Sequence, residues 1–391
     1  MTSAAMHLKL PKLSRRSLQH TDISATTDKK THAHDGEGEA HGTPNVPSGA
    51  QLISLPVGTQ GAKIAVYWTA SPKNQNVTNA YVMMHGRLRD GDTYWTTMNK
   101  ILKSAQKANY KGAPDEAIVA APQMYSEKLN KGQYDNNTLA WADVNAWEAG
   151  SVATHPKGTN LTSMDALDAI LDHFTNSTAF PSMKNVTMIG HGGGAQLMNR
   201  YAATGKNSSS SSVYVRYVVG DPSSSPYFTQ HRTHLKNSNV TTSNCDGYNT
   251  WRYGFHNFPG TLNSNVSAKD YFRQYIQRDV VNLIGLKDVK PNGDQKCMAL
   301  LQGGEKRRDR NLVWWNYINS LARTNESLTG FPGNFSGLPD WSDTHNGSIN
   351  VRLAVVQHAS HDAEKVFSQK TGRSALFDHY SVTQGWRPKN N

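Results

Sequence analysis

The chain contains 391 residues, enough for one large α/β domain or two small ones with a sizeable core. No stretch approaches the roughly 18 consecutive apolar residues of a transmembrane helix. The formal net charge is +11, but the basic residues are scattered, so they indicate a basic surface and not a nucleic-acid interface.

Residues 1–50 are predicted to form a disordered tail. They hold five histidines and few large apolar side chains, a composition that cannot bury enough surface to offset chain entropy. The histidines in THAHDGEGEAHG are of a type that binds metal ions, although a solvated tail is the simpler interpretation. The start of the chain is basic and lacks the apolar core of a signal peptide. A transit peptide to an organelle, a plain tail and a chain start left by signal removal all remain open.

The remainder, residues 51–391, alternates between apolar runs and amphipathic segments. Near-continuous apolar strands separated by helices predict one α/β domain with a mostly parallel sheet flanked by helices. The pattern breaks over about 222–278, which we interpret as a cap or lid insertion. Strands are predicted over 62–68, 80–85, 117–122, 186–190, 213–219, 280–286 and 351–356, and helices over 93–107, 164–174, the segment after the glycines at 192–194, about 308–321 and about 362–369.

The two cysteines, Cys245 and Cys297, leave two interpretations open. They are either buried thiols of a cytosolic protein or a disulfide formed in an oxidising compartment. Eleven Asn-x-Ser/Thr sequons favour the second, since N-glycosylation belongs to the same secretory environment. We therefore predict a secreted glycoprotein. The sequons begin at Asn76, Asn136, Asn160, Asn176, Asn185, Asn207, Asn239, Asn265, Asn325, Asn334 and Asn346.

Glycines follow two of the predicted strands, at the sheet edge where ligands of parallel sheets bind. In HGRLRD, the glycine lets the backbone turn and direct an N–H group into the crevice, as an oxyanion hole requires. In VTMIGHGGGAQ, Gly190 and Gly194 occupy the outer positions of the G-x-S-x-G nucleophile elbow. The nucleophile position between them is Gly192, which has no side chain.

An acid and a base follow two later strands. Asp288 comes directly after the strand at 280–286, and His361 lies in HASHD after the last strand. Elbow, acid and base occur along the chain in the order found in Ser-Asp-His hydrolases. His358 is a second candidate base, although we interpret it as structural.

The chain resembles a group of fungal and bacterial proteins with the α/β-hydrolase fold, over roughly residues 60–380. The resemblance implies that Asp288 is the triad acid, that His361 is the triad base, and that the backbones of Arg87 and Gly193 form the oxyanion hole. It also implies a Cys245–Cys297 bond that ties the cap to the loop after a late strand. The stretches that carry the resemblance are HGRLRDGDTYW, VAAPQM, SMDALDAI, IGHGGGAQLMNRYAA, GDPSSSPY, CDGYNTWRYGF, LIGLKD, LLQGGEKRRDRN and HASHDAEKVF.

This sequence departs from that family at the centre of the chemistry. Family members carry the elbow serine at the position of Gly192. Without a serine oxygen, His361 has no hydroxyl to deprotonate and no acyl-enzyme forms. The sequence therefore predicts a pseudoenzyme of carboxylic-ester hydrolase lineage, binding a small ester, acyl or aromatic ligand or serving a structural role. No metal or organic cofactor and no nucleic-acid partner is expected.

Three alternatives remain. In the first, the protein is an active esterase, in which His361 and Asp288 activate water or in which His191 or a serine of Ser223–Ser225 attacks the ester. In the second, it is an esterase that has been deliberately inactivated. In the third, it is a dinucleotide-binding protein that uses Gly190-x-Gly192-x-x-Ala195, with Asp221 hydrogen-bonded to the ribose. In the non-catalytic case, Trp251, Tyr253 and Phe255 either line a ligand pocket or form a buried strand edge.

Overall fold

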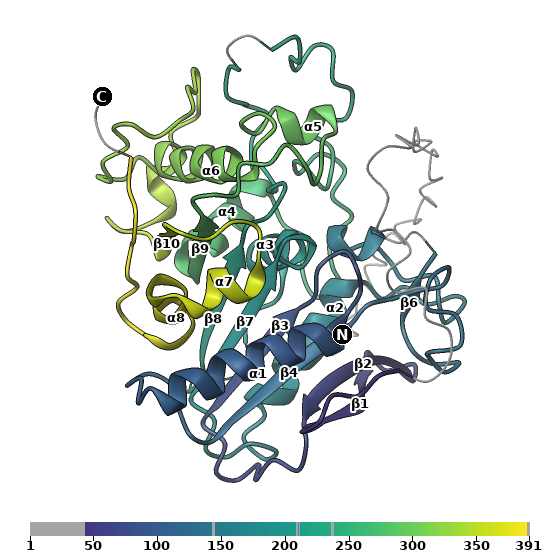
Figure 1. Ribbon diagram of the computed structural model, residues 1–391. Helices are drawn as coiled ribbons and strands as arrows, with labels where there is room; N and C mark the ends of the chain where they lie inside the picture. The colour runs from purple at the N-terminus through teal and green to yellow at the C-terminus, as the bar shows by residue number, and fades with distance from the viewer. Residues whose placement is uncertain (1–43, 143–144, 209, 211, 236–237, 389–391) are drawn as a thin grey trace, which may run out of the picture. The chain divides into compact units, whose positions relative to one another are not determined.

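The apolar runs form one eight-stranded sheet in the order β1-β2-β4-β3-β7-β8-β9-β10 (Figure 1). The computed structural model describes residues 44–142, 145–208, 210, 212–235 and 238–388. Most of the predicted N-terminal tail, residues 1–43, lies outside these ranges. The strands of the sheet are β1 (Ala50–Val57), β2 (Ala62–Thr69), β3 (Asn79–Met84), β4 (Ala117–Gln123), β7 (Asn185–His191), β8 (Tyr214–Gly220), β9 (Asp279–Gly285) and β10 (Val351–Val356).

The sheet is parallel from β4 to β10 and antiparallel only at its β1 and β2 end. This confirms the predicted mostly parallel sheet. Strand β1 was not predicted, because its sequence AQLISLPV contains a proline and polar residues in place of a clean apolar run. It lies at the edge of the sheet, where Pro56 does not interrupt a ladder on both sides. Strands β5 (Tyr125–Ser126) and β6 (Ala140–Trp141) form a separate pair.

Helices cover both faces of the sheet (Figure 1). Alternate residues of β3 divide between two cores: Val82 and Met84 belong to one cluster, and Tyr81 and Met83 to the other. The first cluster is covered by α2 (Ser163–Thr175), α3 (Gly193–Thr204), α4 (Ala268–Gln277) and α6 (Arg307–Ala322), and the second by α1 (Gly91–Lys107), α7 (Ala363–Ser368) and α8 (Lys370–Phe377).

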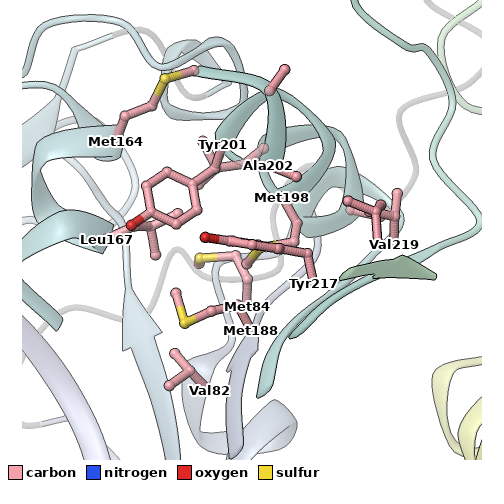
Figure 2. Close-up of a cluster of buried hydrophobic side chains, with 14 of the residues drawn as sticks. Val82, Met84, Met164, Leu167, Met188, Met198, Tyr201, Ala202, Tyr217 and Val219 are labelled. Carbon is pink, nitrogen blue, oxygen red and sulfur yellow. The ribbon is translucent and has the colours of Figure 1, made fainter. Parts of the chain in front are cut away.

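Methionine and tyrosine side chains fill the space between α2, α3 and the sheet (Figure 2). Met84 and Met188 point from neighbouring strands toward Met198 and Tyr201 of α3 (Figure 2). All four side chains are fully buried. This packing holds the start of α3 over the carboxyl ends of β3 and β7, where the glycine-rich turn lies.

The predicted cap segment contains one regular helix at its end. Residues 222–267 have no helix or strand in the part that the structure describes, whereas the last ten residues before 278 form α4. Helix α4 contacts α3 and joins β8 to β9. Its cap residue Ser267 accepts a hydrogen bond from the Asp270 N–H. The predicted cap is therefore limited to the irregular part, residues 222–267.

A disulfide joins Cys245 in this irregular segment to Cys297, the first residue of α5 (Cys297–Leu300). The structure thereby confirms the disulfide prediction. The bond is compatible with an oxidising compartment. Among the described residues, no helix has both the length and the apolar character needed to cross a membrane.

Candidate active site

Gly192 forms a sharp turn between β7 and α3. Its backbone angles are φ 57° and ψ −115°, a conformation that glycine adopts far more readily than a residue with a Cβ atom. The Gly192 N–H donates a hydrogen bond to the carbonyl oxygen of Gly220, 2.9 Å away. A Cβ at Gly190 would overlap the backbone of Gly194, and one at Gly194 would overlap the backbone of His85. The outer glycines are therefore required by the close approach of strand and helix.

Asp288 and His361 meet beside this turn. Asp288 follows β9 and His361 follows β10, and the His361 Nδ1 lies 3.0 Å from the Asp288 Oδ2. The sequence did not indicate the second partner of this carboxylate. Arg307, in the first turn of α6, donates from Nε to Oδ2 over 2.9 Å and from Nη2 to Oδ1 over 2.8 Å.

The Asp288 carboxylate is buried, with 1% of its side chain exposed. Burial acts to raise the pKa of Asp288, but hydrogen bonds from His361 and Arg307 outweigh it and hold the pKa below its usual range. Asp288 therefore stays ionised and favours the His361 tautomer with the proton on Nδ1. The His361 Nε2 then carries the lone pair of a base.

That lone-pair nitrogen faces Gly192. An ideal Cβ built on Gly192 would lie 3.1 Å from the His361 Nε2 and 3.3 Å from Cε1. A nucleophile and its base need to be within about 2.6–3.2 Å, oxygen to nitrogen. The structure thus brings together the three predicted triad positions, with the imidazole next to the place where a side chain at position 192 would begin.

Arg87 and Gly193, the predicted oxyanion donors, are also neighbours. The Arg87 Cγ lies 3.3 Å from the Cβ position of Gly193. Gly193 is the first residue of α3, so its N–H has no acceptor within the helix and is available to a ligand. Arg87 thus lies against the start of α3, and the pair remains a prediction as an oxyanion hole.

Glu148 is a site residue that the sequence did not indicate. It belongs to the short helix η1 (Ala146–Ala149), and a Cβ at Gly193 would overlap its Oε1 atom. Burial raises the pKa of Glu148, opposed by Arg252, whose Nη1 lies 3.6 Å from Oε2. Gln196 donates to the same oxygen over 3.3 Å, whereas Oε1 has no hydrogen-bond partner. A buried carboxylate therefore closes one side of the glycine turn.

His191 lies next to His361, with ring centroids 4.5 Å apart and ring planes tilted by 31°. It is 4% exposed, and burial, followed by the neighbouring His361, lowers its pKa. The Tyr94 hydroxyl lies 3.4 Å from Nδ1, and the Asp221 Oδ2 lies 3.8 Å from Nε2. Asp221 is fully buried and accepts a hydrogen bond from the Gly285 N–H. This burial does not suit the ribose contact of the dinucleotide alternative.

The other candidates are positioned less favourably for catalysis. His358 is exposed. The Ser224 hydroxyl donates to Gln196, and the Ser225 hydroxyl accepts from Asn199, so both serines bind α3.

The three aromatic candidates of the cap segment pack mainly within the protein. Trp251 packs with Phe255 and Phe258, at centroid distances of 5.3 and 4.2 Å. The Tyr253 hydroxyl donates to Asp294. The three side chains thus pack within the protein, but residues 251–255 form no strand, so the predicted strand edge is wrong.

Comparison with solved structures identifies the fold. The poly(3-hydroxybutyrate) depolymerase LpqC from Bordetella parapertussis has a TM-score of 0.52 and 17% identity, over 84% of this chain and 90% of its own. Poly(aspartic acid) hydrolase-1 from Sphingomonas sp. KT-1 has a TM-score of 0.54 and 15% identity, over 81% of this chain and 95% of its own. The protein has an α/β-hydrolase fold. No protein-family model matches the sequence, and neither does any curated protein.

Proposed function

We propose that this protein is a relative of carboxylic-ester hydrolases that has lost its nucleophile and acts by binding or as a structural component. One observation carries the proposal. Gly192 occupies the strained turn between β7 and α3, facing a histidine that is already hydrogen-bonded to a buried carboxylate. The acid and base are thus arranged around a position that has no reactive atom.

The chemical consequence is a large loss of rate. A serine oxygen must attack the ester carbonyl to form the acyl-enzyme, and glycine supplies no such oxygen. Removing the nucleophile of a triad typically lowers the rate by several orders of magnitude, leaving what binding and the oxyanion hole provide. Glycine also relieves backbone strain of about 1–3 kcal/mol at such a turn, so the replacement favours stability.

The groups that remain suit a small ester, acyl or aromatic ligand. The Gly193 N–H at the start of α3 is positioned to donate a hydrogen bond to a carbonyl or carboxylate oxygen. The His361 side chain is 31% exposed and offers a hydrogen-bonding group beside it. The fold of the two structural neighbours is compatible with this proposal.

The test is hydrolysis of a series of p-nitrophenyl esters by the original chain and by Gly192→Ser. Gly61→Ser is the matched control, since Gly61 also has a positive φ but lies in open space. We expect the original chain and the control to be inactive and Gly192→Ser to gain turnover that His361→Ala abolishes. Turnover by the original chain that His361→Ala abolishes would instead establish a serine-free esterase and refute the proposal.

We also propose that the protein is secreted and glycosylated. The support is the Cys245–Cys297 bond together with the eleven sequons. Expression in a eukaryotic secretory host should yield a protein whose mass falls on treatment with an endoglycosidase. An unchanged mass would contradict the glycosylation proposal.

A further inference from the structure

Three side chains with metal-binding atoms converge beneath the glycine turn. His191 ends β7, Asp221 follows β8, and His361 follows β10. One nitrogen of each histidine and one carboxylate oxygen of Asp221 all lie within 4.8 Å of one another. The parallel sheet brings them together, because His191 pairs in register with Gly220, the residue before Asp221.

Two of these atoms are buried without a hydrogen-bond partner. They are the His191 Nε2 and the Asp221 Oδ2, in side chains that are 5% and 0% exposed. Buried polar atoms are rarely left unsatisfied, and such a pair calls for an explanation. The two atoms lie 3.8 Å apart.

That separation distinguishes between possible bridges. It is too long for a direct hydrogen bond, which ends at about 3.2 Å. It is too short for a water that hydrogen-bonds both atoms at about 2.8 Å with tetrahedral geometry, which would separate them by about 4.6 Å. A tetrahedral metal ion with bonds of about 2.0–2.2 Å separates its ligand atoms by about 3.4 Å. The observed 3.8 Å lies nearer to the ligand separation of a shared metal ion than to that of a bridging water.

His361 is prepared to be the third ligand. Its Nδ1 is held by Asp288, which leaves the Nε2 lone pair free and fixes the ring orientation. Carboxylate–histidine–metal arrangements of this kind are usual around protein metal sites. Gly192 leaves space beside this nitrogen, where a side chain would crowd it. The three ligand atoms lie within 4.8 Å of one another, whereas bound ligand atoms lie about 3.4 Å apart, so the side chains must close by up to about 1.4 Å when a metal binds. The His361 side chain, which is 31% exposed, has room to make this movement.

We propose that His191, Asp221 and His361 bind a divalent transition-metal ion of the zinc class. Two imidazoles and one carboxylate suit zinc and its neighbours, whereas calcium and magnesium prefer oxygen ligands. Three protein ligands leave a fourth position for water or a ligand atom. This site goes beyond the proposed loss of the nucleophile and opposes the sequence-based expectation of no metal.

Calorimetric titration with Zn²⁺, repeated with Co²⁺, tests the proposal on the full chain. Five tail histidines would compete, so the titrated protein carries alanine at all of them: His7, His20, His32, His34 and His41. We expect one equivalent of metal to bind to this variant. Asp221→Asn and His361→Asn should each weaken binding at least tenfold, and His358→Ala, in the same loop as His361, should leave it unchanged.

Asp288→Asn provides a readout that a merely crowded site would not give. Loss of the group that orients a metal-bound histidine typically weakens affinity about 10–100-fold. Circular dichroism and a thermal melt establish that each variant is folded. His361→Asn should disturb folding least, because the His361 side chain is partly exposed to solvent. No binding after the tail substitutions, or binding that Asp221→Asn and His361→Asn leave unaltered, would overturn the proposal. Metal binding is measured without ester hydrolysis, so this result is independent of whether the original chain is an esterase.

Discussion

The conformation of Gly192 makes a quantitative prediction about stability. In Gly192→Ala, a residue with a Cβ atom must adopt φ 57° and ψ −115°, which costs about 1–3 kcal/mol of backbone strain. The same atom would lie 3.1 Å from the His361 Nε2, so the imidazole must shift, and a tight contact of this kind costs about 1 kcal/mol more. We expect the free energy of unfolding to fall by about 2–4 kcal/mol in total.

Denaturant unfolding followed by circular dichroism measures this change, and two further variants separate its parts. Gly61→Ala also places a Cβ at a positive φ, of 80°, but with no atom within 4 Å, so it should cost only about 1 kcal/mol. In a His361→Ala background, Gly192→Ala should cost about 1 kcal/mol less than in the original chain, because the contact is gone. A neutral Gly192→Ala substitution would refute the assignment of strain to this turn. An equal cost in both backgrounds would refute the contact with His361.

Three further predictions concern the supports of the fold and site. The folded pKa of Asp288 lies below that of the unfolded chain, so this carboxylate stabilises the protein above about pH 4 and the contribution is lost as the pH falls through the folded pKa. Unfolding measured between about pH 7 and pH 2 should show a shallower acid loss in Asp288→Asn. Arg216→Ala should lower the free energy of unfolding by about 1.5–3 kcal/mol, because the buried Asp279 carboxylate loses its Nε donor, 2.7 Å away, but keeps its contacts with Arg352 and Tyr214, and a cost below 1 kcal/mol would contradict this. Replacing Cys245 and Cys297 with alanine should remove about 4 kcal/mol, given their sequence separation of 52, and an unchanged midpoint in denaturant would show that the bond constrains nothing.

The sequence predicted the sheet well because its central strands are continuous apolar runs buried on both faces. The same criterion missed β1, since an edge strand packs on fewer neighbours and tolerates Pro56 and polar residues. The sequence pattern also placed α4 within the predicted cap segment, although α4 is a regular helix of the sheet's covering layer. The short amphipathic stretch of α4 is rich in tyrosine and polar residues, and only its packing on α3 distinguishes it from the irregular chain before it.

Gly192, Asp288 and His361 could be proposed from the sequence as candidate site residues because each follows a strand. Arg307 and Glu148 were not predicted, because neither lies at a strand end. Arg307 reaches Asp288 from the first turn of α6, and Glu148 reaches Gly193 from the short helix η1, 45 positions earlier in the chain. Such contacts depend on tertiary packing and leave no periodic pattern in the sequence.

The double hydrogen bond from Arg307 to Asp288 bears on how such a site is inherited. This ion pair joins the chain after β9 to the start of α6, and both side chains are buried. Removing either partner of a buried pair typically costs about 3–5 kcal/mol. Purifying selection for a folded protein would thus preserve the acid even in a lineage that no longer hydrolyses anything. The persistence of an acid next to a histidine therefore records the demands of folding as well as those of catalysis.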